Sequence, residues 1–318
     1  SAIQRAGRAA RQFPGQCFRM WNKTDELAFP KSESAEITRV DLSESLLYLA
    51  AQGVSDFNSF SWFEKPPQHH IKIATDNLIL MGALSAENKI TELGLELHKF
   101  PLPLRSARLL IEGQKMKAGS EACDIAAILQ ERDFFLKDTF QQYLGDNLES
   151  DLEARLIALQ EARKNNLRGL SVSTTKTVLQ ASEQIRSLLK VHSSLEVDSR
   201  KLLLMSFKDR LCRRRGKSDK ALMVGGRGVR LQPESLVKTS EFFLALNGVE
   251  TQGAETQVNF ACGIPKEMLL SFFADEIKKT RRLSFNVEKG HFYLEEYKTL
   301  WGLPLEEPSM LPATANDI

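Results

Sequence analysis

The spacing of apolar residues divides the chain into a helical front and a tail with a different period. Up to about residue 212, apolar positions recur every three to four residues, which is typical of one face of an α-helix. The helices that this spacing predicts are 69–81, 92–99, 104–117, 121–131, 150–164, 174–191 and 199–212. An earlier helix is predicted to begin at Asp41, with Glu44 completing a capping box, and to end at Gly53. A helical bundle is sufficient to explain these apolar helix faces.

The tail and the first residues follow other patterns. After Gly216, short apolar runs alternate with glycine-bearing turns, as in a small β-barrel. The runs are 222–224, 229–231, 242–246 and 258–262, and they are followed by a helix that starts at Pro265 and a hairpin made of 283–287 and 291–297. Residues 225–228, Gly-Gly-Arg-Gly, lie between two runs and are interpreted as a β-turn or a bulge. At the front, residues 1–11 are expected to start a helix, 17–21 to form a strand and 25–38 a loop.

Two short extended pieces follow the second predicted helix. They are 83–84 and 90–91, and they flank a polar turn. This order is typical of the wing of a winged helix, although any small hairpin gives the same pattern. Residues 301–318 contain three prolines and no period, so we expect the chain to be cut short.

Composition excludes several classes of protein. The chain has 318 residues, of which 42% are hydrophobic and 26% charged, a balance typical of folded domains and not of disorder. No apolar run reaches the roughly 18 residues of a membrane span, and the N-terminus does not have the pattern of a signal peptide. The four cysteines lie far apart, which excludes a disulfide scaffold and suits a reducing compartment. We therefore expect a cytoplasmic protein.

Charge is concentrated in one segment. The formal net charge is only +2, yet residues 200–230 hold eleven basic residues against two acidic ones. A local run of cations on a nearly neutral protein indicates contact with a phosphate backbone. A solvated basic face is the alternative.

The search for enzymatic motifs is mostly negative. The sequence has no G-x-x-x-x-G-K-[ST] loop, no G-x-S-x-G and no H-E-x-x-H, and its five histidines offer no pair with metal-ligand spacing. We therefore predict no metal site and no complete active site in this chain.

One short segment does suggest a mechanism. It reads Gln4-Arg5-Ala6-Gly7-Arg8-Ala9-Ala10-Arg11. On a helix, positions three apart share a face, so Arg8 and Arg11 could point at one anion. Arginine suits this task because its guanidinium binds phosphate oxygens in pairs and stays charged.

This segment closely resembles motif VI of DEAH-box helicases of superfamily 2, Q-R-x-G-R-x-G-R, with Ala10 at the second glycine. The resemblance implies that Gln4, Arg8 and Arg11 face the γ-phosphate of ATP and that Arg11 is the arginine finger. Further similarities follow in the family's order. They are 14–21 (the next strand), 36–42, 62–67 and 82–94 (the winged helix), 100–110 (the helical ratchet domain), and 210–216 with 225–228 (the entry to an OB-like domain of the bacterial HrpB type).

The resemblance implies a mainly α, multidomain chain with a winged helix, a ratchet-like helical bundle and a small OB-like β-barrel or α+β domain. The expected boundaries are 1–24 for the end of the second RecA-like domain, 25–92 for the winged helix, 93–215 for the ratchet domain and 216–318 for the OB-like domain. Such a chain would be the accessory C-terminal region of an ATP-dependent RNA helicase. It would form one wall of a channel for single-stranded RNA, with DNA as the alternative strand. ATP and Mg²⁺ would bind the full-length parent, whose RecA-like domains are missing here, and the fragment alone would be inactive.

The basic run supplies the candidate phosphate contacts. They are Arg210, Arg213, Arg214, Arg215 and Arg227. Ion pairs within the chain would explain any one of them equally well. Phe242, Phe243 and Phe260 could stack on bases but fit the core of the barrel better. Two other functions remain open, namely a stand-alone nucleic-acid-binding or adaptor protein and a protein-interaction scaffold.

Overall fold

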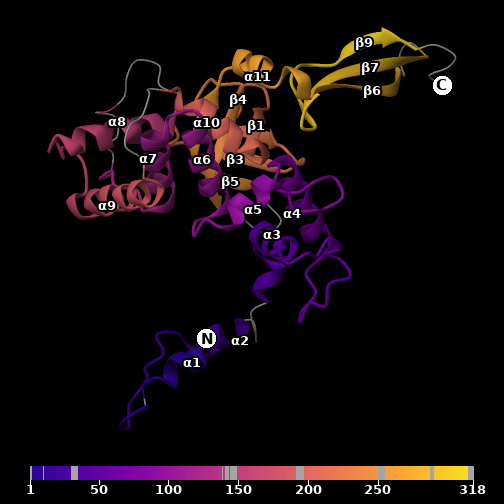
Figure 1. Ribbon diagram of the computed structural model, residues 1–318. Helices are drawn as coiled ribbons and strands as arrows, with labels where there is room; N and C mark the ends of the chain where they lie inside the picture. Colours follow the sequence, from indigo (N-terminus) through magenta and orange to yellow (C-terminus); the bar gives the residue numbers. More distant parts are fainter. Residues whose placement is uncertain are drawn as a thin grey trace. The chain divides into compact units, whose positions relative to one another are not determined.

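The computed structural model describes residues 2–9, 11–29, 35–137, 139, 143, 149–190, 197–249, 255–286 and 290–313 (Figure 1). These residues fall into two compact units. The first consists of Ser1–Val40 and Trp62–Pro67, and the second of Asp41–Ser61 and Gln68–Ile318.

The first unit contains two short helices and a 3₁₀ turn. They are α1 (Ala2–Ala6), α2 (Lys23–Ala28) and η1 (Glu36–Thr38), and none of them has a buried residue. Helix α2 begins with a reciprocal capping box between Asn22 and Asp25, a local signal that the expected loop over 25–38 overlooked. The expected helix over 1–11 is wrong beyond Ala6, and residues 17–21 form no strand.

The helices of the second unit match the periodic segments closely. They are α3 (Ser43–Ala51), α4 (Gln68–Leu80), α5 (Glu92–His98), α6 (Leu104–Lys115), α7 (Gly119–Gln130), α8 (Asp151–Arg163), α9 (Val172–Leu189) and α10 (Ser199–Ser206). The expected capping box at the start of α3 is wrong. Asp41 accepts a hydrogen bond from the Ser43 N–H at 2.9 Å, but Glu44 accepts one from the Leu104 N–H at 3.2 Å and so caps α6 instead. The expected wing is reduced to one antiparallel bridge between Leu84 and Ile90.

A closed five-stranded barrel follows the helices, as the tail predicted. Its strands are β1 (Leu211–Arg214), β2 (Lys220–Met223), β3 (Gly228–Leu231), β4 (Phe242–Val249) and β5 (Thr256–Ile264), in the order β1-β2-β3-β5-β4. The helix expected over 199–212 is wrong beyond Ser206, because a 3₁₀ turn, η3 (Lys208–Arg210), leads directly into β1. Gly225 and Gly226 form the β2–β3 turn, each with φ of 83°, which glycine adopts without steric cost.

A second antiparallel sheet comes last in the chain. After α11 (Lys266–Phe272) and η4 (Ala274–Glu276), strands β6 (Ile277–Asn286) and β7 (His291–Leu300) form the expected hairpin. Two short strands absent from the expectation, β8 (Leu303–Pro304) and β9 (Ser309–Pro312), also pair with β7. Figure 1 shows β9 beside β7. Strand β6 pairs only with β7 among the described strands, so its other edge is open.

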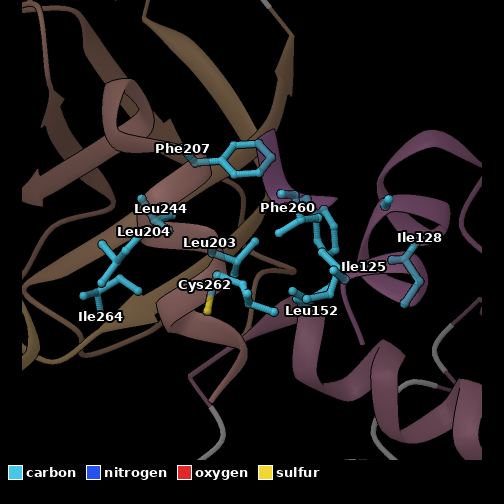
Figure 2. Packing of buried hydrophobic residues seen from close by; sticks show 14 of the residues in the cluster. Ile125, Ile128, Leu152, Leu203, Leu204, Phe207, Leu244, Phe260, Cys262 and Ile264 are labelled. Carbon is cyan, nitrogen blue, oxygen red and sulfur yellow. The ribbon is translucent and has the colours of Figure 1, made fainter. Parts of the chain in front are cut away.

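One apolar core joins the helices to the barrel. Leu203 and Leu204 of α10 belong to the same buried cluster as Ile125 of α7 and Ile264 of β5 (Figure 2). Asp151, the first residue of α8, adds polar ties to the barrel side, because its carboxylate accepts hydrogen bonds from the backbone N–H groups of Leu236 and Ala261 at 2.7 and 2.8 Å. The helical region and the barrel therefore share one core within the second unit.

Candidate nucleic-acid interface

The three motif residues lie on the surface of the first unit. Gln4 is in α1, Arg8 is in the turn that follows it, and Arg11 is in a bend, all with exposed side chains. Because the helix ends at Ala6, Arg8 and Arg11 do not share a helix face, and the geometric argument for that spacing is wrong. Exposed guanidinium groups still suit the oxygens of a phosphate.

Most cations of the basic run pair with acidic residues of the same unit. Five cations form six ion pairs, namely Arg200 with Asp198, Lys208 with Glu276, Arg210 with Asp209, Lys220 with Glu255, and Arg230 with both Asp219 and Glu255. Lys208 also lies 5.0 and 5.1 Å from the ring centroids of Phe273 and Trp301, which is within cation–π range. The excess of positive charge in the sequence is thus largely compensated in the structure.

Arg214 is a structural residue of the barrel. Its side chain is buried, and its guanidinium donates to the carbonyl oxygens of Ser218, Val237 and Ser240 at 2.9, 3.0 and 2.9 Å. Burial lowers its pKa, because the charged form loses solvation. These carbonyl oxygens therefore occupy the guanidinium N–H groups that a phosphate would need.

Arg213 is engaged in a similar way at the opposite face of the same strand. Its guanidinium donates to the carboxylates of Glu241 and Glu307 at 3.0 and 3.1 Å and to the Glu306 carbonyl at 3.3 Å. Ion pairing within the chain, the alternative that the sequence left open, therefore accounts for Arg213.

Arg210, Arg215 and Arg227 lie at two different ends of the barrel hairpins. Arg215 is exposed in the β1–β2 turn, and Arg227 is exposed in the β2–β3 turn, at the other end of β2. Arg210 directly precedes β1 and therefore lies at the same end as the β2–β3 turn, since the Val224 N–H donates to the Leu211 carbonyl at 2.9 Å. The five candidates do not form a single patch.

A shallow cavity of about 440 Å³ lies beside the β1–β2 turn. Arg213, Arg215, Glu241 and Glu307 contribute to its lining. Because arginines and glutamates both face this cavity, it carries mixed charge, and Arg215 is its exposed cation.

The aromatic residues named from the sequence are core residues. Phe242 and Phe243 are fully buried and Phe260 is 8% exposed, so none presents a ring face to a base. Among the described residues, one aromatic pair that is exposed consists of Phe285 and Phe292, at the far end of the β6–β7 hairpin. Sequence reasoning missed them because it searched for charge between residues 200 and 230. The signal was present just before the predicted hairpin, where four basic residues, Lys278, Lys279, Arg281 and Arg282, precede Phe285.

Two other kinds of site were searched for in the described ranges. No group of three or more histidine, cysteine, aspartate or glutamate side chains there is arranged to hold a metal ion. Among the same residues, no helix is long and apolar enough to cross a membrane.

Comparisons with known proteins identify the relatives of the chain. No protein-family model matches it. The chain is 33% identical over 136 residues to the probable ATP-dependent RNA helicase DHR2 of Saccharomyces cerevisiae, 31% identical over 147 residues to a probable ATP-dependent RNA helicase DHX35 homolog of Caenorhabditis elegans, and 38% identical over 112 residues to the ATP-dependent RNA helicase HrpA of Borreliella burgdorferi. These matches cover 43%, 46% and 35% of the chain but only 18%, 20% and 14% of the relatives, so the chain spans at most about a fifth of their length.

Solved structures show the fold. Two crystal structures of HrpB from Escherichia coli each match 99% of this chain with a TM-score of 0.70, at 23% and 22% sequence identity. The matched part is 36% of the HrpB chain. The resemblance to DEAH-box helicases is thereby confirmed. The homologues of this chain are DEAH-box ATP-dependent RNA helicases, and its fold is that of an HrpB-like C-terminal part.

Proposed function

We propose that this chain is the accessory C-terminal region of an ATP-dependent RNA helicase and forms one wall of a channel for single-stranded RNA. The observation that carries the proposal is the sequence identity of 31–38% to three proteins named as RNA helicases. In this proposal residues 1–24 end a RecA-like domain, 25–92 form a winged helix, 93–215 a ratchet domain and 216–318 an OB-like domain. The missing RecA-like domains of the parent are its partners.

Within the channel, exposed cations would hold the phosphate backbone. Arg215 and Arg227 are exposed in the two turns that flank β2, and Arg210 lies at the end that carries Arg227. Contacts of this kind position a strand without reading its sequence. Arg214 would act indirectly, because its hydrogen bond to the Ser218 carbonyl holds the β1–β2 turn. Arg213 would also act indirectly, because it ties β1 to Glu241 and Glu307.

In the full-length parent, ATP with Mg²⁺ would supply the phosphoryl group that is transferred. Gln4, Arg8 and Arg11 would donate hydrogen bonds to its phosphates, with Arg11 stabilising the charge that develops during transfer. Their exposure in the first unit is compatible with this role. The expected result of Arg11→Ala in the parent is a loss of about 10³-fold in ATP turnover, with RNA affinity unchanged.

Fluorescence anisotropy with labelled single-stranded RNA across a salt series tests the channel proposal on this chain. The logarithm of the affinity should fall linearly with the logarithm of the salt concentration, because cations of the protein that bind phosphates release counterions from the RNA. The double variant Arg215→Glu/Arg227→Glu should weaken binding and flatten that slope. The matched control Arg168→Glu/Lys176→Glu changes the same charge on the helical region, where both side chains are exposed, and should bind as wild type. Absence of binding at low salt would contradict the proposal and favour an adaptor or scaffold.

A further inference from the structure

The far end of the last sheet presents two aromatic rings to solvent. Phe285 of β6 and Phe292 of β7 are direct cross-strand partners, with ring centroids 4.9 Å apart and planes inclined by 56°. Their exposed fractions are 49% and 40%. A cross-strand aromatic pair normally gains its stability by burial, so two rings this exposed require another explanation.

The same face of the sheet continues from apolar to basic. Alternate residues of a strand point to one face, and the β6–β7 register places five residues of each strand on the face of the two rings. This aromatic face consists of Ile277, Lys279, Arg281, Leu283 and Phe285 on β6 with Phe292, Leu294, Glu296, Lys298 and Leu300 on β7. Side chains on one face of a strand repeat about every 6.7 Å, so the cations follow the rings at regular steps along the edge of the sheet.

The cations of β6 are incompletely neutralised. Its ten residues include Lys278, Lys279, Arg281 and Arg282 and no acidic residue. Arg281 pairs with Glu296 at 2.9 Å, but in the part of the chain that the structure describes, neither Lys278, Lys279 nor Arg282 has a carboxylate within ion-pair distance. Lys279 stands directly opposite Lys298, and like charges in that position repel each other.

This charge selects the kind of partner. A second copy that added its own β6 to the open edge would bring two strands of four cations together, which electrostatics opposes. The aromatic face carries three cations, Lys279, Arg281 and Lys298, against one acidic residue, Glu296, and so matches a polyanion that carries flat apolar groups. Single-stranded nucleic acid has this chemistry, since bases stack on aromatic rings while cations follow the phosphates.

We infer that the aromatic face of β6 and β7 binds single-stranded nucleic acid, with bases stacked on Phe285 and Phe292 and phosphates near Lys279 and Arg281. This inference rests on the proposed function in its choice of nucleic acid, but it names a second surface that is separate from the barrel turns. It assigns the sheet of β6 and β7 a role in binding the nucleic acid, in addition to the turns that flank β2.

The test is anisotropy with a short labelled oligouridylate and, in parallel, a labelled oligodeoxythymidylate of equal length. The variant Phe285→Ala/Phe292→Ala should lose about tenfold or more in affinity for whichever strand the wild type binds. Phe285→Tyr/Phe292→Tyr should retain affinity, because tyrosine keeps the ring. Phe285→Leu/Phe292→Leu should lose it, because leucine keeps the apolar surface but not the ring. The matched control is Val172→Ala/Leu188→Ala, which removes two exposed apolar side chains of α9 and should bind as wild type.

A second readout locates the contact. An oligouridylate that contains bromouridine is crosslinked by ultraviolet light, and the adducts are mapped by mass spectrometry. Adducts on Phe285 or Phe292 are expected. Circular dichroism of each variant confirms that the sheet still folds, and the Tyr and Leu pairs keep the test valid if the Ala pair does not.

The outcomes separate this inference from the proposed function. If the wild type binds RNA while the Leu pair binds equally well and adducts fall only on the barrel turns, this inference is overturned and the proposed function stands. If the wild type binds neither strand, both are overturned. Loss of binding to phosphatidylserine vesicles in the Leu and Ala pairs, with nucleic-acid affinity unchanged, would assign the face to a membrane surface instead.

Discussion

The Arg105 guanidinium lies 2.5 Å from the carboxylate of Asp209, although 104 positions separate the two residues in the sequence. Arg105 is in the first turn of α6, and Asp209 is in the 3₁₀ turn that leads into β1. The same guanidinium also reaches Asp41 at 3.5 Å, just before α3. One side chain thus links three segments that the sequence keeps far apart.

Loss of this pair should destabilise the second unit. Asp209 is almost fully buried, so Asp209→Asn leaves the Arg105 charge buried without its main partner, and we expect a cost of about 3 kcal/mol. The measurement is the free energy of unfolding in urea. Asp76→Asn is the control, because its pair with Lys72 is exposed on α4 and should contribute less than about 1 kcal/mol. Equal effects of the two substitutions would contradict a special role for Arg105.

Arg214 and Arg215 are adjacent in the sequence, but we expect their substitution to have very different effects on stability. Arg214→Met should cost about 2 kcal/mol or more, because three carbonyl oxygens lose a donor in a buried place. Arg215→Met should change stability by less than about 0.5 kcal/mol, because that side chain is exposed. Thermal unfolding of both variants decides the question. A larger loss at Arg215 would show that the turn is held in a different way.

The folding stability of the chain should depend on pH partly through Glu149. Burial opposes its ionisation, but hydrogen bonds from the backbone N–H groups of Ser240 and Thr239 outweigh this effect and lower its pKa. A carboxyl with a lowered pKa stabilises the folded chain above its unfolded pKa of about 4.5, and this contribution disappears as the pH falls through the folded value. Glu149→Gln should therefore lose less stability than wild type between about pH 6 and pH 3.5.

The urea midpoint at the two pH values measures this difference. Glu234→Gln is the control, because Glu234 is an exposed residue of the β3–β4 connection. An unchanged pH dependence in Glu149→Gln would show that the hydrogen bonds from Ser240 and Thr239 to Glu149 do not favour its charged form.

The cysteines should differ in reactivity. Cys17 is exposed, whereas Cys123, Cys212 and Cys262 are buried. Burial raises the pKa of Cys123 and of Cys262 to about 12, so their thiolate forms are scarce at neutral pH. One of the four thiols should react quickly with Ellman's reagent in the native chain, and all four in denaturant. Cys17→Ser should abolish the fast phase, and a fast phase that survives would point to opening of the core.

Local patterns were enough for most elements of the fold. Helices α4 and α6 follow from apolar periodicity, and the β2–β3 turn follows from the glycines at 225 and 226. Strand β1 was missed because Leu211 continues the helical spacing of α10, and only pairing with β2 and β4 makes it a strand. The capping partner of Glu44 was missed for a related reason, since Leu104 is 60 positions away.

The candidate interface was harder to predict than the fold. A run of arginines has the same charge whether its side chains face a ligand or the protein itself. Arg214 binds carbonyl oxygens of three residues, and backbone acceptors leave no trace in a sequence. The exposure of Phe285 and Phe292 depends on which strands cover the hairpin, and that is also a property of the folded chain.

The core shared by Leu203, Leu204 and Cys262 has a mechanical consequence (Figure 2). A close-packed interior is barely compressible and transmits displacement. Because buried side chains of α7, α8 and β5 belong to one continuous cluster, a displacement of either helix is transmitted to the barrel. The helices and the barrel would then move together as one rigid body, and any RNA bound at the barrel turns would move with them.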